Sequence, residues 1–205
     1  MNEIKLCGER KIQLLLKFND SVTTFNVQAG EIQIKRLAPS DAAAYREIRL
    51  EALGLNPEAF GSTFEAESAG PLEHFAERLT SSTVFAAYRN SEWLGMAGFM
   101  RRQGLKDEHK GFLWGMYVRA DAREAGVGRR LAEAVIDFAR KQVELIQLTV
   151  VSENEVARRL YASLGFVEYG IERKALKQNG RYYDEILMAK DLTPAADINS
   201  MKSGR

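Results

Sequence analysis

Cysteine and histidine are scarce in this sequence, and their scarcity excludes several kinds of site. The 205 residues contain one cysteine, Cys7, and two histidines, His74 and His109. A single cysteine cannot form an internal disulfide, and no Cys or His residues have the spacing of a zinc site. We therefore expect a protein without a resident metal.

Long hydrophobic runs and an excess of charge of one sign are also missing. The longest apolar run near the start, Leu14–Leu16, is followed by Lys17, whereas a membrane-spanning helix needs about 20 apolar residues. The 29 Lys and Arg residues nearly balance 28 Asp and Glu residues, for a formal net charge of +1. This balance is not typical of proteins that coat nucleic acid or acidic membranes. We therefore expect a cytoplasmic protein with no nucleic-acid or membrane partner.

What the sequence does contain is an alternation of strand and helix patterns. The expected order is β-α-α-β-β-β-α-β-α-β-β, which is typical of an α/β fold, a mixed sheet with helices on its faces. Strands are expected at 33–37, 83–88, 93–100, 112–118, 145–151, 166–171 and 185–192, and helices at 42–53, from 71, at 129–140 and at 155–164. These elements predict one domain over residues 32–192, followed by a polar C-terminal tail at 193–205.

Capping residues predict where some of these helices begin and end. Asp41 is expected to cap the N-terminus of helix 42–53, and Gly54 to close it. Gly165 is expected to end the last helix. That helix is expected to turn one face inward, because three apolar residues recur on it at fourfold spacing: Val156, Leu160 and Leu164.

Residues 1–31 form an N-terminal extension with a less clear pattern. Ile12–Phe18 and Val22–Val27 have strand-like composition, and Asn19-Asp20-Ser21 would form the turn between them. Two alternatives remain open, a short hairpin outside the main domain or a flexible leader. If the extension is an interaction arm, the chain would form a homodimer.

The segment most informative about chemistry joins the strand 112–118 to the next helix. Gly126 and Gly128 lie in this turn, and arginines flank it. Unpaired N–H groups and the positive end of a helix make such a junction suited to phosphate. A dinucleotide fingerprint would need glycine at Leu131, and the Gly-Lys-Ser/Thr of a P-loop is absent. The alternatives are a pyrophosphate site of another class or a tight turn that only caps the helix.

Two motifs in this order make the chain resemble the GCN5-related N-acetyltransferase family. The first is Arg123-x-x-Gly126-x-Gly128 after a strand, and the second runs from Asn154 through Tyr161 to Gly165-Phe166. The resemblance covers roughly residues 32–192. It implies a central, mostly antiparallel sheet that is splayed and flanked by helices. It also implies acetyl-CoA as co-substrate, with no metal, and an N-acetyltransferase activity.

The family's cofactor contacts carry over to positions that match these motifs. The splayed strand would offer backbone groups of Met116, Tyr117 and Val118 to the pantetheine arm. Asn154 would meet the pantetheine or nearby backbone, and Tyr161 would protonate the departing thiolate. The alternative for Tyr161 is a core aromatic residue. The pyrophosphate would be held by backbone amides of Arg123, Glu124, Ala125, Gly126, Val127, Gly128 and Arg129.

The general base is not identified by the resemblance, because residues 112–118 contain no carboxylate. Many relatives carry a glutamate on this strand. The remaining candidates are a water molecule on backbone carbonyls or one of four carboxylates: Glu65, Glu67, Asp184 and Glu185. The missing carboxylate also supports an alternative function, a catalytically weak acyl-CoA-binding regulatory module.

Relatives bind the acceptor between the first two helices and the hairpin of the last strands. Residues 50–77 contain six glutamates and no Lys or Arg, which would attract a protonated amine. The expected partner is therefore an amine-bearing small molecule or a protein amino group. Candidate acceptor-binding residues are Phe60, Phe64, Glu65, Trp114, Tyr182 and Tyr183.

Overall fold

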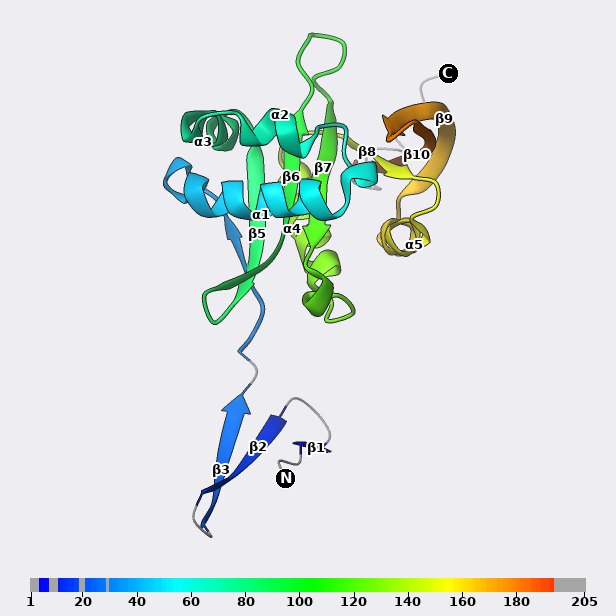
Figure 1. Ribbon diagram of the computed structural model, residues 1–205. Helices are drawn as coiled ribbons and strands as arrows, with labels where there is room; N and C mark the ends of the chain where they lie inside the picture. The colour runs from blue at the N-terminus through cyan, green and yellow to red at the C-terminus, as the bar shows by residue number, and fades with distance from the viewer. Residues whose placement is uncertain (1–3, 8–10, 19–20, 29, 194–205) are drawn as a thin grey trace.

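The structure, a computed structural model, contains two separate β-sheets and five α-helices among the residues that it describes (Figure 1). These residues are 4–7, 11–18, 21–28 and 30–193, with side chains described from 30 to 193. Within them, no helix is long and apolar enough to cross a membrane.

The larger sheet has seven strands in the order β4-β5-β6-β7-β8-β10-β9. Every neighbouring pair is antiparallel except β7 and β8, which are parallel. The mixed, mostly antiparallel sheet expected from the sequence is therefore confirmed. The strands are β4 (Gln33–Arg36), β5 (Thr83–Arg89), β6 (Glu92–Arg101), β7 (Lys110–Val118), β8 (Leu145–Val151), β9 (Val167–Gln178) and β10 (Arg181–Asp191).

The sheet opens in its centre, between β7 and β8. These strands pair only from Lys110–Leu145 to Phe112–Gln147, and beyond that point they diverge. On its other edge β7 stays paired with β6, with a bulge at Gly115, whose φ is +64°. A bulge bends a strand and increases its local twist. The remainder of β7, residues 113–118, thus has one edge without a strand partner.

Helices cover both faces of this sheet. Helices α1 (Ala42–Leu55), α2 (Phe64–Ser68) and α3 (Leu72–Ser81) lie on one face. There Tyr45 and Phe75 pack edge to face, 6.0 Å between ring centroids. Helices α4 (Val127–Ala139) and α5 (Glu155–Ser163) contribute to a second core cluster on the opposite face. Figure 1 shows α1 and α2 in front of the central strands and α4 behind them.

Several local predictions need correction. Asp41 does not cap α1, because its carboxylate accepts from Ala38 N (2.9 Å) and Lys35 Nζ (2.8 Å) instead. Gly54 lies within α1, which continues to Leu55. On α5, Val156 points to solvent, 74% exposed, because Tyr161 turns the apolar face toward the core. The short helices η1 (Pro39–Asp41), η2 (Pro57–Ala59), η3 (Ala120–Ala122) and α2 were not predicted.

The first residues form a three-stranded antiparallel sheet of β1 (Ile4–Cys7), β2 (Lys11–Phe18) and β3 (Ser21–Gln28). The two strands expected at 12–18 and 22–27 are therefore present and pair with each other. Residues 19–20 of the expected turn, and residues 194–205 of the expected tail, lie outside the described residues.

Candidate functional site

A row of free backbone amides lies where β7 leads into α4. Glu124 and Gly126 both have positive φ, +64° and +80°, and the first helical backbone bond is Arg130 N to Gly126 O, 3.1 Å. The N–H groups of residues 124–129 donate to no acceptor within the described residues. Consecutive free amides at the positive end of a helix form a concave site suited to an anion.

The two glycines of this turn have different surroundings. A Cβ on Gly126 would meet no atom within 4 Å, so the position that a side chain would take is open space. A Cβ on Gly128 would lie 3.3 Å from Leu160 Cδ2. Gly126 therefore leaves the amides accessible, whereas Gly128 allows α4 to pack closely against α5.

Two of the flanking arginines already have partners in the protein. Arg123 Nε donates to Val118 O at 3.2 Å, and Arg129 Nη2 donates to Ser163 Oγ at 2.7 Å. Both side chains are exposed or nearly so. Their positive charges remain beside the row of amides.

The splayed part of β7 presents backbone to one side and side chains to both cores. Met116 and Val118 pack against the core that contains α4. Tyr117 is buried on the α1 side, where its hydroxyl donates to Glu51 Oε1 at 2.8 Å. Burial and the carboxylate of Glu51 raise the pKa of Tyr117 to about 12. Its side chain is therefore not available to a ligand, and Tyr117 itself pairs with Met96 of β6.

The second motif places Asn154 and Tyr161 on α5. Asn154 caps this helix, with its Oδ1 accepting from Ala157 N at 3.1 Å. Tyr161 is 4% exposed and packs edge to face on Phe166, 5.8 Å between centroids. Burial raises the pKa of Tyr161, so its hydroxyl stays protonated at neutral pH. Both environments suit the structural roles that the sequence left open.

Three of the four candidate carboxylates for a base are held by cations or lie in solvent. Burial opposes ionisation of Glu67, but hydrogen bonds from Arg49 and Arg78 outweigh it and lower its pKa to about 2. Asp184 accepts from Lys174 N and pairs with Arg173, and these contacts lower its pKa. Glu65 is exposed.

Glu185 differs from these carboxylates. It lies on β10 opposite Val151 of β8, beside the point where β8 has left β7. Burial raises its pKa, the Thr149 hydroxyl opposes this by a hydrogen bond, and the carboxylate of Glu172 raises the pKa further. Within residues 30–193 no Lys or Arg pairs with Glu185. Burial without a cationic partner therefore favours the protonated form of Glu185, in contrast to Glu67 and Asp184.

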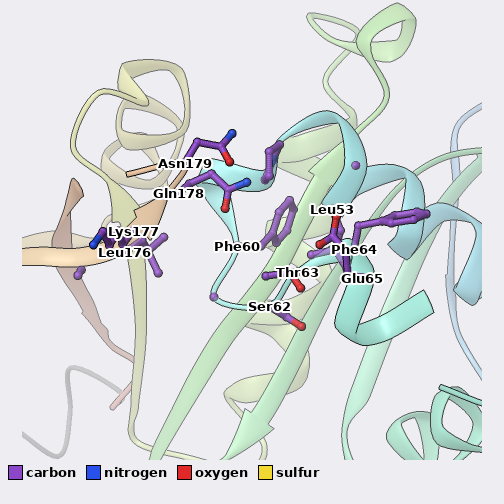
Figure 2. A pocket seen from close by; sticks show the side chains of 14 residues that line it. Leu53, Phe60, Ser62, Thr63, Phe64, Glu65, Leu176, Lys177, Gln178 and Asn179 are labelled. Atoms are coloured by element: carbon purple, nitrogen blue, oxygen red, sulfur yellow. The ribbon is translucent and has the colours of Figure 1, made fainter. Parts of the chain in front are cut away.

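A cavity of about 600 Å³ lies between the end of α1, the loop before α2 and the hairpin of β9 and β10. Figure 2 shows Phe60 and Ser62–Glu65 on one side and Leu176–Asn179 on the other. Of the expected acceptor-binding residues, Phe60, Phe64 and Glu65 line it. The other three, Trp114, Tyr182 and Tyr183, do not.

The charge of this cavity is not strongly acidic. Glu51 pairs with Arg119 and Glu67 with two arginines, so both are neutralised. Glu65 remains in the lining and Lys177 lies on the opposite wall. The expectation that six glutamates attract an amine is therefore weakened, because arginines outside the 50–77 segment compensate two of them, Glu51 and Glu67.

Sequence reasoning overlooked Arg49. Tyr45, Ile48, Arg49 and Ala52 recur at the spacing of one buried helix face, and Arg49 is only 5% exposed. A charged residue within an apolar stripe was the available signal. Lys177 was also not anticipated, since nothing in the sequence distinguished it from other surface lysines.

Comparisons with known proteins agree with this geometry. Residues 45–166 match the family described as Acetyltransferase (GNAT) family. The chain is 28% identical over 130 residues to the N-alpha-acetyltransferase RimI of Mycobacterium tuberculosis, covering 63% of this chain and 73% of that protein.

Two solved structures show the same fold. One is an acetyltransferase of the GNAT family from Streptococcus pneumoniae, with a TM-score of 0.70, 23% identity and coverage of 80% of this chain and 100% of that one. The other is yncA from Salmonella typhimurium with its cofactor acetyl-CoA, with a TM-score of 0.66, 23% identity and coverage of 80% and 96%. With the family match spanning more than half of the sequence, the chain belongs to the Acetyltransferase (GNAT) family and is an N-acetyltransferase.

Proposed function

We propose that this enzyme transfers an acetyl group from acetyl-CoA to a primary amine of a small molecule or a protein, by direct attack in a ternary complex. The observation that carries the proposal is the row of free amides at 124–129, which adjoins the unpaired edge of β7. A diphosphate suits the amides, and an extended amide-containing chain suits a strand edge.

The residues that would hold the cofactor follow from these two features. The pyrophosphate lies on the amides of 124–129, with Arg123 and Arg129 supplying positive charge. The pantetheine pairs with the backbone of Met116 and Val118. The free Nδ2 of Asn154, whose Oδ1 is engaged in capping, donates to the same arm.

The acceptor amine attacks as a neutral nucleophile, so the site needs a group that removes its proton. Glu185 serves this role in the proposal. It lies beside the opening of the sheet and, within residues 30–193, has no cationic partner that would keep it permanently ionised. A base with a raised pKa accepts a proton more readily than Glu67 or Asp184.

The thioester of acetyl-CoA supplies the acyl group: the new bond joins the amine nitrogen to the carbonyl carbon, and the carbon–sulfur bond breaks. A backbone N–H near Val118 stabilises the charge that develops on the carbonyl oxygen. Tyr161, kept protonated by burial, donates its hydroxyl proton to the departing thiolate.

The acceptor is a primary amine that enters through the cavity beside β9 and β10. A volume of about 600 Å³ is within the range of small-molecule and short-peptide sites. The relative from Mycobacterium tuberculosis is named as an N-alpha-acetyltransferase. Both observations support the terminal α-amine of a polypeptide as one acceptor to be tested first.

The test is to mix the enzyme with acetyl-CoA and single amines while following the release of free thiol. The amines are short peptides with free N-termini, lysine derivatives, polyamines and amino acids. We expect thiol release with at least one of them, and mass spectrometry should find the acceptor heavier by one acetyl group.

One specific observation favours a second candidate, the weak acyl-CoA-binding module. β7 carries no carboxylate over its whole length, Lys110–Val118. Tight binding of acetyl-CoA without thiol release for any amine would support this candidate over acetyl transfer.

A further inference from the structure

Three charged side chains form a cluster under α1, in which Arg49 and Glu67 are buried and Arg78 is partly exposed. Arg49 is 5% exposed, and its Nη2 lies 2.7 Å from Glu67 Oε1. Arg78 Nη1 lies 2.8 Å from Glu67 Oε2. Two guanidinium groups thus share one carboxylate, and the cluster keeps one positive charge in excess. The side chain of Arg78 is 33% exposed, so solvent reaches its charge, whereas Arg49 and Glu67 are shielded from solvent.

One donor of this cluster has no partner. Arg49 uses Nε and Nη2 for Glu67, whereas Nη1 is buried and unpaired among the described residues. The indole Nε1 of Trp114 is likewise buried and unpaired, and its ring packs against the core cluster under α1. A buried N–H without an acceptor costs about 1–3 kcal/mol. Each of these two buried donors therefore needs an oxygen atom as hydrogen-bond acceptor.

Their position connects the catalytic strand with the acceptor cavity. Trp114 directly precedes Gly115, the bulge residue of β7. A Cβ on Gly115 would meet a single described atom within 4 Å, Arg49 Nη1 at 3.7 Å, so the glycine leaves space beside this donor. The Arg49 guanidinium carbon lies 5.1 Å from the ring centre of Phe60, which lines the cavity.

We propose that Arg49 Nη1, assisted by Trp114 Nε1, binds the oxygen of a carbonyl or carboxylate group attached to the carbon that bears the acceptor amine. The site would select α-amino carbonyl compounds, which are peptide N-termini and amino acids. This deepens the proposed function and rests on it. Guanidinium N–H groups suit such oxygens, and their excess positive charge disfavours a second ammonium group, as in a polyamine.

Gly115 also places this oxygen close to the reacting amine. The bulge immediately precedes Met116–Val118, whose free edge is the proposed place of the thioester. An oxygen held beside Gly115 therefore suits a carbonyl oxygen three bonds from the attacking nitrogen, as in an α-amino carbonyl compound. A carbonyl far along the acceptor would not reach Arg49 Nη1 while the amine lies at the thioester.

The test compares two acceptors of similar shape, L-alaninamide and 3-methyl-2-butylamine, in which an isopropyl group replaces the carboxamide. The variant is Arg49→Lys, which retains a cation for Glu67 but not the planar fork. We expect the KM for L-alaninamide to rise about 10- to 100-fold. The KM for the alkylamine and for acetyl-CoA should change less than about twofold.

Arg78→Lys is the matched control, because Arg78 contacts the same carboxylate but has no part in the site. It should leave the ratio of the two acceptor KM values unchanged. Trp114→Phe keeps an aromatic ring but removes the pyrrole part of the indole together with its N–H, so it should raise the KM for L-alaninamide selectively. Adding free L-alanine as an acceptor distinguishes a carboxylate from a peptide carbonyl as the preferred source of the oxygen.

A binding measurement keeps the inference testable apart from turnover. Calorimetry with CoA present should detect N-acetyl-L-alaninamide bound to the wild type and at least tenfold weaker binding to Arg49→Lys. Equal effects of Arg49→Lys on both acceptors, or unchanged binding of N-acetyl-L-alaninamide, would overturn the inference. If this ligand binds selectively but no amine is acetylated, the proposed function fails and the oxygen site stands.

Discussion

At the scale of single residues, the environment of a carboxylate decides what it can do. Glu67 and Glu185 are both largely removed from solvent, yet their pKa values shift in opposite directions. Two arginines surround Glu67, whereas a threonine hydroxyl and a second carboxylate face Glu185. Ion pairing favours the charged form and unpaired burial opposes it. Folding therefore favours the ionised form of Glu67 and the protonated form of Glu185.

Glu185→Gln should lower kcat by about 10²- to 10⁴-fold, the usual contribution of general base catalysis. The pKa of Glu185 is raised, so activity of the wild type should rise with pH as this group loses its proton. The acidic limb of the kcat/KM profile should lie above the ordinary glutamate range and should vanish in the variant.

Glu172→Gln is the matched control for this prediction. Glu172 lies directly opposite Glu185 on β9 and is exposed. Removing its negative charge should shift the acidic limb to lower pH, because it raises the pKa of Glu185, while kcat at high pH stays the same. An unchanged limb in Glu185→Gln would assign the base to another group.

Tyr161→Phe tests the proton donor. The variant loses only the hydroxyl, and the edge-to-face packing on Phe166 is retained. We expect kcat to fall by about 10²-fold or more, with the affinity for acetyl-CoA nearly unchanged by calorimetry. Equal kcat in the wild type and Tyr161→Phe would mean that Tyr161 is only a core aromatic residue.

At the scale of elements, the turn between β7 and α4 shows why one glycine matters more than its neighbours. Gly126 has a φ of +80° and open space on its side-chain position. A leucine there would be strained and would cover the amides of 124–129. Gly126→Leu should weaken acetyl-CoA binding at least tenfold by calorimetry.

Gly180 provides a control of equal backbone strain. Its φ is +81°, and a Cβ there also meets nothing within 4 Å, but it lies in the turn between β9 and β10. Gly180→Leu should leave the affinity for acetyl-CoA within about twofold of the wild type. Micromolar affinity retained by Gly126→Leu would mean that the pyrophosphate binds elsewhere.

The ion pairs of Glu67 join three helices, since Arg49 lies on α1, Glu67 on α2 and Arg78 on α3. The pKa of Glu67 is about 2, against 4.5 for a free glutamate. The ionised carboxylate of Glu67 therefore stabilises the fold above pH 4.5. This stabilisation, roughly 3 kcal/mol, is lost as the pH falls from 4.5 to 2. Urea unfolding at several pH values should show this loss in the wild type.

The matched variants are Glu67→Gln and Glu65→Gln on the same short helix. Glu67→Gln should be less stable at pH 6, and the difference from the wild type should shrink toward pH 2. Glu65 is exposed and makes no ion pair within residues 30–193, so its replacement should leave the pH dependence unaltered. A similar loss in both variants would contradict the role of the cluster.

Elements with strong local signals were predictable from the sequence. The strands β5 to β8 follow apolar runs between clear turns, and Asn90 and Ser91 take positive φ as a tight hairpin requires. Helix α2 was not predicted, because five residues carry too little periodicity. Its buried carboxylate depends on arginines 18 and 11 residues away. No local pattern contains such a contact.

The candidate site likewise has a part that the sequence predicts and a part that depends on distant contacts. The amides of 124–129 belong to one continuous motif, so the sequence was sufficient to locate them. Glu185, Thr149 and Glu172 meet only because β10 inserts between β8 and β9. That strand order is a property of the whole sheet. The sequence could therefore name Glu185 only as one of several candidates for the base.

At the scale of the whole molecule, charge is arranged by contacts rather than by segments. Residues 119–130 hold four arginines and two carboxylates, and residues 50–77 hold six glutamates. Arg119 from the first segment pairs with Glu51 from the second, 2.7 Å apart. Part of the apparent separation of charge is thus cancelled where α1 meets the end of β7. Arg123 and Arg129 flank the proposed phosphate site, and Arg129 also pairs with Glu133 at 3.5 Å.

The remaining question at this scale is whether the N-terminal extension takes part in acetyl transfer. Its strands β1–β3 pair only with each other, and the seven-stranded sheet begins at Gln33. The described core side chains come from residue 32 onward. A chain starting at Gly30 retains Ile32, whose carbonyl accepts from Arg130 at 2.6 Å, and should therefore keep both cores.

We expect this truncated chain to melt within about 2 °C of the full chain, since about 1 kcal/mol corresponds to 2–4 °C at this size. Its kcat/KM for acetyl-CoA and for the acceptor should agree within about twofold. Light scattering on both chains measures the molar mass in parallel. Fewer chains per particle with unchanged kinetics would make the extension an assembly element outside the active site. Reduced kcat/KM would show that the extension contributes to the transfer reaction itself.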